Sequence, residues 1–122
     1  MKSSAKPAMR VLVADDQKGV GTTIAELVRA CNHEVVEVVG SGVEAIQAYQ
    51  RHHPDVVLLD YNMPRLNGAT ACRNILARDA NARVVLVSGG PQQNLTDIGA
   101  VAMLTKPVNL EDLNALLTRA AA

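Results

Sequence analysis

Asp55-Val-Val-Leu-Leu-Asp60 is the stretch that decides the fold, because four consecutive aliphatic residues lead directly into an aspartate. An apolar run without polar alternation is typical of a strand buried on both faces, as in a parallel sheet. The same pattern recurs at 10–14 and 83–88, and the first of these runs is followed by Asp15 and Asp16. We therefore expect buried parallel strands with polar groups at their carboxyl ends.

Two weaker strands and five helical segments complete an alternating order. The run at 101–104 is short, and the mixed segment at 34–39 is typical of an edge strand. Ser41 and Glu44 form a capping box, and Asn109 is a good N-cap. The expected helices cover 22–30, 43–50, 69–77, 92–98 (the weakest) and 110–120. Five β-α units with right-handed crossovers predict a five-stranded parallel sheet covered on both faces.

Polar side chains gather where the predicted strands end, namely at Asp15, Asp16, Asp60, Ser88 and Lys106. Ligands of such sheets bind beyond the carboxyl ends of the strands. Three carboxylates at one edge would repel one another unless a divalent cation neutralised them. Oxygen donors without His or Cys select Mg2+ or a similar ion such as Mn2+.

The acidic cluster suggests phosphoryl transfer. A carboxylate beside a divalent ion can attack phosphorus, and the reaction mainly needs alignment and neutralised oxygen charge. Asp60 is the expected nucleophile because it ends the central strand and opens the loop that runs to Gly68. Lys106 would supply a second positive charge, and the Ser88 hydroxyl a hydrogen bond.

Five motifs in this order resemble the receiver domain of two-component response regulators, over about residues 9–120. They are Val11-Leu-Val-Ala-Asp-Asp16, Val57-Leu-Leu-Asp-Tyr-Asn-Met-Pro-Arg-Leu-Asn-Gly68, Val85-Leu-Val-Ser88, Gly99-Ala100 and Leu104-Thr-Lys-Pro107. The resemblance implies a flavodoxin-like α/β fold, a (βα)5 doubly wound parallel sheet with strand order 2-1-3-4-5. The segment 1–8 is polar and contains Pro7, so we expect a flexible tail at 1–8 followed by a receiver domain at 9–122.

The resemblance also implies a metal site and an acceptor. Asp60 would accept the phosphoryl group. Asp16 and Asp60 would bind Mg2+ (or Mn2+) directly, Asp15 would act through water, and the backbone carbonyl of Asn62 would complete the set. Lys106 would pair with the acceptor carboxylate or its phosphate.

Other site positions follow from the same likeness. Ser88 would move toward the phosphate after transfer, and the small Gly89 would keep the approach to Asp60 open. The Lys106–Pro107 peptide bond would be cis, as X-Pro bonds can be.

Three departures from the family pattern lie on the side of the molecule that usually meets partners. Met103 stands where receivers usually carry Tyr or Phe, so the usual aromatic switch cannot operate. Ser88 and Lys106 are 18 positions apart, about one helical turn fewer than is typical, so a shortened fourth helix is expected. Val108 replaces a frequent Phe. We expect the phosphorylation chemistry to be kept and its readout to be altered.

Composition excludes several classes of function. The chain has 122 residues, formal net charge zero, and two aromatic residues, both Tyr. One domain with an aliphatic core is therefore expected, without the basic field that nucleic-acid binding needs. The chain has neither a membrane-spanning apolar run nor a secretory signal, so a cytoplasmic location is expected. Cys31 and Cys72 are expected to be free thiols.

Expected partners are a histidine kinase or histidine phosphotransfer protein and an unidentified downstream protein. The chain would act as a single-domain switch or phosphate shuttle, not as an enzyme on external substrates. One alternative is a pseudo-receiver that binds partners without phosphorylation, and another is a receiver excised from a larger regulator or hybrid kinase. A haloacid-dehalogenase-type phosphatase would need an aspartate where Asn62 stands. Gly19-Val-Gly21 is a poor dinucleotide loop, because Ile24 occupies the third glycine position.

Overall fold

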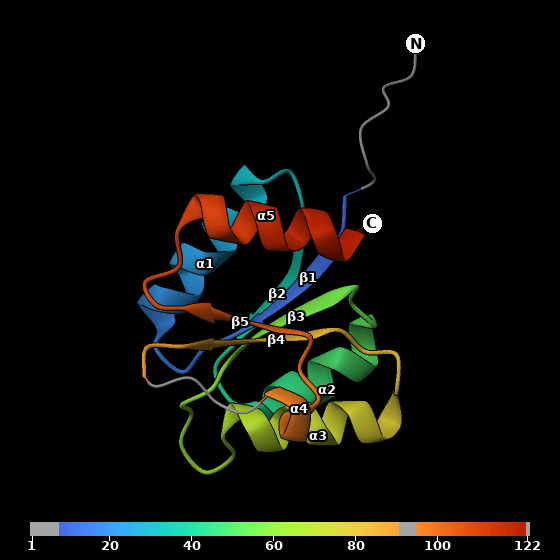
Figure 1. Ribbon diagram of the computed structural model, residues 1–122. Helices are drawn as coiled ribbons and strands as arrows, with labels where there is room; N and C mark the ends of the chain where they lie inside the picture. The colour runs from blue at the N-terminus through green and yellow to red at the C-terminus, as the bar shows by residue number, and fades with distance from the viewer. Residues whose placement is uncertain (1–7, 91–94, 122) are drawn as a thin grey trace.

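The computed structural model describes residues 8–90 and 95–121, with the backbone alone at 95, 96 and 121. Positions 1–7 of the expected flexible tail lie outside this part of the chain, as do positions 92–94 of the expected fourth helix. The described chain forms one central sheet with helices on both faces (Figure 1). The helices Lys18–Ala30 and Leu110–Ala121 cover one side, and the helices Gly42–His52, Gly68–Arg78 and Leu95–Ile98 cover the other.

The sheet has five parallel strands in the order β2-β1-β3-β4-β5, which confirms the predicted topology. The strands are β1 (Arg10–Ala14), β2 (Glu34–Val39), β3 (Val56–Asp60), β4 (Val84–Ser88) and β5 (Ala102–Thr105). All residues of β3 and β4 are buried, as expected of strands covered on both faces. Because Asp60 pairs in register with Val87, the carboxyl ends of β3 and β4 open onto the same edge.

The helices are α1 (Lys18–Ala30), α2 (Gly42–His52), α3 (Gly68–Arg78), α4 (Leu95–Ile98) and α5 (Leu110–Ala121). The predicted caps are present: the Ser41 hydroxyl accepts a hydrogen bond from the Glu44 N–H (3.1 Å), and the Asn109 side chain accepts one from the Asp112 N–H (2.8 Å). The described part of the fourth helix is Leu95–Ile98, and the shortening expected from the sequence stays a prediction because positions 92–94 lie outside the described residues.

Helix α1 begins at Lys18, four residues before the predicted start. Two glycines in its first turn lower the intrinsic helix propensity, which is why the sequence placed the start later. Packing explains Gly21: a Cβ there would lie 3.2 Å from Cγ1 of Val38 and 3.5 Å from Cβ of Asp15. The helix therefore approaches β2 and the end of β1 closely at a position where there is little room for a side chain.

Two aliphatic clusters fill the space on either side of the sheet. Residues such as Leu59, Leu86 and Ile75 form the cluster under α2 and α3, whereas Leu58 and Leu117 belong to the cluster under α1 and α5. Both clusters lack Phe and Trp, as the composition predicted. The sheet is thus held rigidly between two apolar layers, which fixes the positions of the residues at its carboxyl edge.

One tyrosine joins two helices on the α2 side. Tyr49 is buried, and its hydroxyl donates a 2.7 Å hydrogen bond to Oδ2 of Asp79, which ends α3. Burial, then the hydrogen bond to the Asp79 carboxylate, raises the pKa of Tyr49 well above its usual value. The bond therefore joins α2 to the C-terminal end of α3.

The two cysteines are free thiols, as predicted, with Cys72 buried and Cys31 half-buried. Burial raises the pKa of the Cys72 thiol to about 11. Across 8–90 and 95–121, every helix is too short or too polar to cross a lipid bilayer.

Candidate functional site

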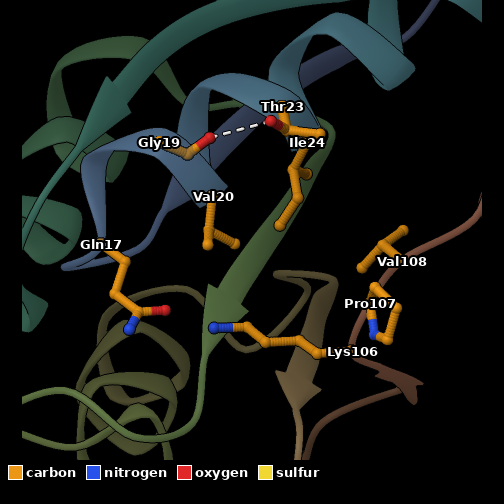
Figure 2. Close-up of a pocket in the computed structure, with 8 residues that line it drawn as sticks. All are labelled: Gln17, Gly19, Val20, Thr23, Ile24, Lys106, Pro107 and Val108. Atoms are coloured by element: carbon orange, nitrogen blue, oxygen red, sulfur yellow. Dashed lines mark hydrogen bonds between the residues drawn. The ribbon is translucent and has the colours of Figure 1, made fainter.

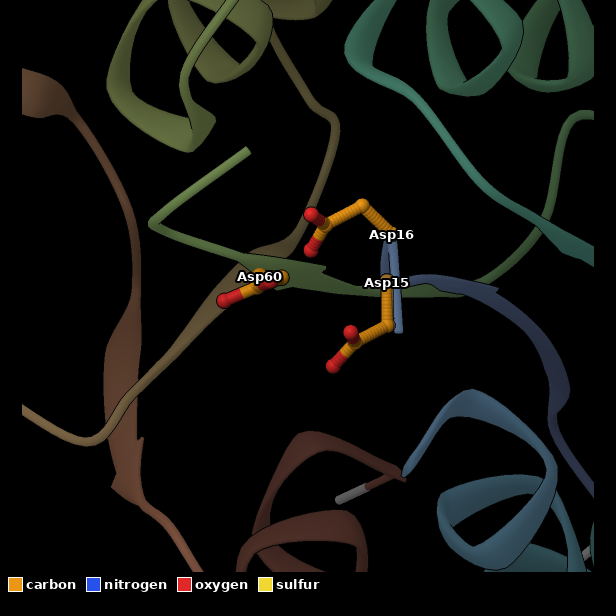
Figure 3. A group of neighbouring side chains, drawn as sticks. All are labelled: Asp15, Asp16 and Asp60. Carbon is orange, nitrogen blue, oxygen red and sulfur yellow. The ribbon is translucent and has the colours of Figure 1, made fainter. Parts of the chain in front are cut away.

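Three carboxylates converge at the carboxyl edge of the sheet (Figure 3). Asp15 and Asp16 directly follow β1, and Asp60 is the last residue of β3. Each offers a carboxylate oxygen, and these oxygens lie within 4.8 Å of one another. Asp15 and Asp60 are almost fully buried, with 2% and 3% of their surface exposed, whereas Asp16 is exposed. The cluster therefore has a buried floor and one side that faces solvent.

Local backbone bonds hold two of the carboxylates in place. Oδ1 of Asp15 accepts a hydrogen bond from the Gln17 N–H (2.8 Å), and Oδ1 of Asp60 accepts one from the Asn62 N–H (3.2 Å). Both are turns in which an aspartate bonds to the backbone two residues on. The orientation of each side chain is thus set by the residues that immediately follow it.

The ammonium of Lys106 is the counter-charge of the site. It lies 2.9 Å from Oδ2 of Asp15 and 3.2 Å from Oδ1 of Asp60, with 20% of its side chain exposed. The Lys106 N–H donates to the carbonyl of Ser88, which anchors the backbone from which this side chain reaches across β4. The sequence-predicted lysine and two of the aspartates are therefore in direct contact.

Burial and mutual repulsion shape the ionisation of these groups. Burial, and then the negative charge of Asp15, raises the pKa of Asp60 to about 6, against the opposing effects of Lys106 and the Asn62 N–H. Burial acts to lower the pKa of Lys106, but its 2.9 Å contact with Asp15 and the charges of Asp60 and Asp15 leave that pKa raised. The site thus keeps its ammonium at neutral pH, and it holds its acidic groups close together at an energetic cost.

The donor set suits a divalent cation. Three carboxylates face one ammonium, so two negative charges are in excess when all are ionised. Oδ2 of Asp15 is fully buried, and although the ammonium lies 2.9 Å away, no described residue gives this oxygen a well-aligned hydrogen bond. A buried, under-satisfied oxygen beside excess negative charge is a place where a hard cation lowers the energy. The residues present therefore fit the Mg2+ that the sequence suggested.

The loop after Asp60 is folded back against the site. The Gly68 N–H donates to the Tyr61 carbonyl (2.8 Å), which closes the loop, and the Tyr61 N–H donates to Val87 on the neighbouring strand. A Cβ on Gly68 would lie 2.5 Å from the carbonyl oxygen of Asp60, so only glycine allows this approach. The closed loop presents Asn62 beside Asp60 and at the rim of the acidic pocket.

The loop also rests on the start of α2. Leu66 is half-buried, and a Cβ on Gly42 would lie 2.7 Å from its carbonyl oxygen and 3.1 Å from its side chain. Arg65, just before it, has a positive φ of 70°. We describe Gly42 and Leu66 together as the loop seat. The seat connects the position of Asn62 to the N-terminus of a helix that the capping box holds.

Four other predicted positions are placed as follows. Gly89 lines the acidic pocket, while Ser88 is buried at the end of β4 and its hydroxyl accepts a hydrogen bond from the Gly90 N–H (3.1 Å). Met103 is half-buried and packs against the cluster under α2 and α3. The Lys106–Pro107 peptide bond is cis, as predicted. Ser88 is not among the described residues that line the acidic pocket.

Sequence reasoning missed two features of the site. Gln17 lines the acidic pocket and its backbone orients Asp15, and its place directly after the two aspartates could have revealed it. The loop seat joins residues 24 positions apart, Gly42 and Leu66, and no local pattern marks such a contact.

Comparison with known proteins connects this geometry to a family. The family model described as the response regulator receiver domain matches residues 11–118. The transcriptional regulatory protein PdtaR of Mycobacterium tuberculosis is 35% identical over 108 residues, covering 85% of this chain. The chain spans 52% of the length of PdtaR. The chemotaxis protein CheY of Listeria monocytogenes is 32% identical over 117 residues, covering 93% of this chain and 98% of CheY.

Solved structures agree with the sequence comparison. CheY in a CheX-CheY-BeF3-Mg2+ complex from Borrelia burgdorferi superimposes with a TM-score of 0.87 at 25% identity, covering 96% of this chain and 91% of that one. The signal receiver domain of NarL from Mycobacterium tuberculosis gives a TM-score of 0.86, also at 25% identity, with 93% and 96% covered.

Proposed function

The chain belongs to the response regulator receiver domain family, whose members are phosphoacceptors in signalling, and from this membership we propose that Asp60 is the residue that accepts the phosphoryl group. The observation that carries the proposal is the contact of the buried Asp60 carboxylate with the Lys106 ammonium at 3.2 Å, beside Asp15 and Asp16. An ionised carboxylate held against a cation can act as nucleophile without a separate base.

In the transfer we propose, the bonds that form and break involve only Asp60 and the phosphoryl donor. A carboxylate oxygen of Asp60 forms a bond to phosphorus, and the bond from phosphorus to the donor nitrogen or oxygen breaks. The donor atom leaves with the electron pair and takes a proton from solvent when its basicity requires one. Lys106 contacts the carboxylate before transfer and is within reach of the phosphate oxygens afterwards.

We further propose that the family's Mg2+ site is formed by Asp16, Asp60 and the backbone carbonyl of Asn62, with Asp15 acting through water. Mn2+ would serve in the same place, since both ions prefer oxygen ligands. A bound ion would supply neutralisation of the phosphoryl oxygens during transfer. Crowded carboxylates and the under-satisfied Oδ2 of Asp15 support this assignment.

The surroundings of Asp60 give Ser88 and Gly89 supporting roles. Ser88 ends the strand next to Asp60, and its hydroxyl, which accepts a hydrogen bond from the Gly90 N–H, would move to donate one to a phosphate oxygen. Gly89 lines the acidic pocket without a side chain, which leaves the approach to Asp60 open. Met103 packs as an aliphatic residue, so the readout of phosphorylation would run through a side chain other than an aromatic one.

The physiological donor we propose is a histidine kinase or histidine phosphotransfer protein, and the receiver would pass its signal to a downstream protein in the cytoplasm. This chain would promote only its own phosphorylation and dephosphorylation. Asn62 supports that view, because it has no carboxylate to act as acid and base on an external phosphoester. We propose the receiver domain at 9–122.

The experiment that tests the proposal is labelling with acetyl phosphate, followed by intact-mass measurement. The wild type should gain one phosphoryl group in Mg2+ and none in excess chelator. Asp60→Asn should remain unlabelled, while Asp97→Asn, the same change at an exposed position of α4, should label normally. Labelling of Asp60→Asn would show that the acceptor is another residue. A wild type that stays unlabelled in Mg2+ would favour partner binding without phosphorylation.

A further inference from the structure

An open groove of about 660 Å3 lies between the first turns of α1 and the segment that follows β5 (Figure 2). Val20 and Ile24 project into it from α1, and Pro107 and Val108 face them from the other side. These four side chains make the walls largely apolar. We call this feature the α1 groove.

The α1 groove is continuous with the acidic pocket. Gln17 and Lys106 line both, and the acidic pocket adds Asp16, Asp60 and Asn62. Figure 2 shows the Gln17 amide and the Lys106 ammonium at the same end of the groove. A molecule that places a phosphoryl group at Asp60 therefore has an apolar channel beside its remaining atoms.

The charge distribution limits what the groove can take. Lys106 is the charged side chain among the described residues that line it, and that charge lies at the end shared with the acidic pocket. Away from that end, the Thr23 hydroxyl already donates a 2.9 Å hydrogen bond to the Gly19 carbonyl. A ligand with an anionic head and a short apolar body matches this arrangement, because the walls offer few polar partners.

We propose that the α1 groove binds the apolar chain of a small acyl phosphate and so selects among phosphoryl donors. The inference rests on Asp60 being the acceptor. In the step, an Asp60 oxygen bonds to phosphorus, and the bond between phosphorus and the acyl oxygen breaks. The acyl carboxylate leaves with the electron pair, so no proton has to be supplied, and its chain lies along Val20, Ile24 and Val108.

Val108 is one of the apolar side chains that line the α1 groove. It is half-buried, packs against the cluster under α1 and α5, and lines the groove beside Pro107. A larger ring at this position would fill space that the acyl chain needs. Val108→Phe is therefore the variant that separates groove binding from the chemistry at Asp60.

The test compares labelling rates with acetyl phosphate and butyryl phosphate at low donor concentration in Mg2+. Because the groove is open, two additional methylenes should be only partly buried, which should make the second-order rate constant for butyryl phosphate about 3- to 10-fold higher. Val108→Phe should bring that ratio close to one. Val101→Phe makes the same change at an exposed position away from the groove and should keep the wild-type ratio.

Three outcomes overturn the inference. Equal rates for the two donors in the wild type would do so, as would an unchanged ratio in Val108→Phe. If the ratio is near one and Val108→Phe instead slows transfer from a phosphorylated histidine protein, the groove receives a protein and not an acyl chain. A wild type that acetyl phosphate does not label at all would mark failure of the acceptor assignment itself.

Discussion

The Lys106 ammonium lies 3.2 Å from Oδ1 of Asp60, although Lys106 follows the edge strand β5 and Asp60 ends β3 at the centre of the sheet. The lysine side chain reaches across the end of β4 to make this contact. It also contacts Asp15, which follows the next strand beyond β3. One side chain therefore connects the carboxyl ends of β5, β3 and β1, and we expect its removal to change stability and metal binding in opposite directions.

Lys106→Met should lower the free energy of unfolding by about 1–3 kcal/mol at pH 7 without Mg2+, because it leaves two buried carboxylates without their cation. The same variant should bind Mg2+ more tightly than the wild type, since a competing positive charge is gone. Urea unfolding in chelator and calorimetric Mg2+ titration measure the two effects. Weaker Mg2+ binding by the variant would show that the ion and the ammonium do not share these carboxylates.

Asp60→Asn should be more stable than the wild type at pH 7 without Mg2+. Burial and Asp15 raise the folded pKa of Asp60 to about 6, above the value near 3.9 expected in the unfolded chain. Between these values the folded state binds more protons than the unfolded state, so stability falls as pH rises. Asparagine removes this loss, and the expected gain is about 2–3 kcal/mol.

The pH dependence of the stability gain in Asp60→Asn distinguishes ionisation of Asp60 from a simple packing change as its cause. The difference between Asp60→Asn and the wild type should shrink toward zero as the pH falls to about 4, where Asp60 is protonated in the native protein. Urea unfolding at pH 4 and pH 7 in chelator measures it. A gain of the same size at both pH values would exclude ionisation of Asp60 as its origin.

Mg2+ should stabilise the folded protein by mass action. At ten times the dissociation constant, one bound ion adds about 1.4 kcal/mol to the free energy of unfolding. Asp16→Asn should lose most of this stabilisation, because Asp16 is the solvent-facing carboxylate of the cluster. Glu26→Gln, which neutralises an exposed acid elsewhere on α1, is the control. Thermal unfolding measured at increasing Mg2+ concentrations checks this. If Mg2+ stabilised Asp16→Asn and Glu26→Gln equally, Asp16 would not be a ligand of the ion.

Gly42→Ala should destabilise the protein by about 1–3 kcal/mol, because the new Cβ would meet the Leu66 carbonyl oxygen at 2.7 Å. It should also weaken Mg2+ binding, since the displaced loop carries Asn62. Gly19→Ala is a matched control: it also lies in the first turn of a helix, and a Cβ there meets nothing within 4 Å. If calorimetry gives both variants wild-type Mg2+ affinity, the loop seat does not position the metal site.

Tyr49→Phe should raise the pKa of Asp79 toward its ordinary value. The Tyr49 hydroxyl is the main cause that keeps the pKa of this carboxyl low, ahead of the Asn81 N–H. A carboxyl with a lowered folded pKa adds stability at neutral pH and loses it as the pH falls through that value. NMR titration of the Asp79 side chain measures the shift. An unchanged Asp79 pKa in the variant would mean that the hydrogen bond contributes little.

The strands and the acidic cluster could be predicted because each corresponds to a short local pattern in the sequence, an apolar run followed by one or two aspartates. Val57 to Leu59 can only be buried on both faces, and a parallel sheet brings its carboxyl ends to one edge, so Asp60 had to lie near Asp15. The caps at Ser41 and Asn109 were equally local and were found. Where a residue and its partner lie within one motif, sequence reasoning was sufficient.

The remaining features depend on contacts between distant segments. The start of α1 was placed four residues late, because Gly21 has a low helix propensity. Its close approach to Val38 and Asp15, which favours glycine at this position, is a contact between distant segments that the sequence does not reveal. The Tyr49–Asp79 bond spans 30 residues, and Tyr49 alone indicates only a core position. The direct pairing of Lys106 with Asp15 likewise required the three-dimensional arrangement.

The scarcity of aromatic residues has a practical consequence for the acceptor. Tyr61 directly follows Asp60, is half-buried, and is tied to the neighbouring strand through its N–H. The other tyrosine, Tyr49, is buried on the α2 side, and the chain has no tryptophan. In a Tyr49→Phe background, Tyr61 is the one remaining tyrosine of the chain. Its emission then reports on the immediate neighbourhood of the reactive carboxylate, with no added dye.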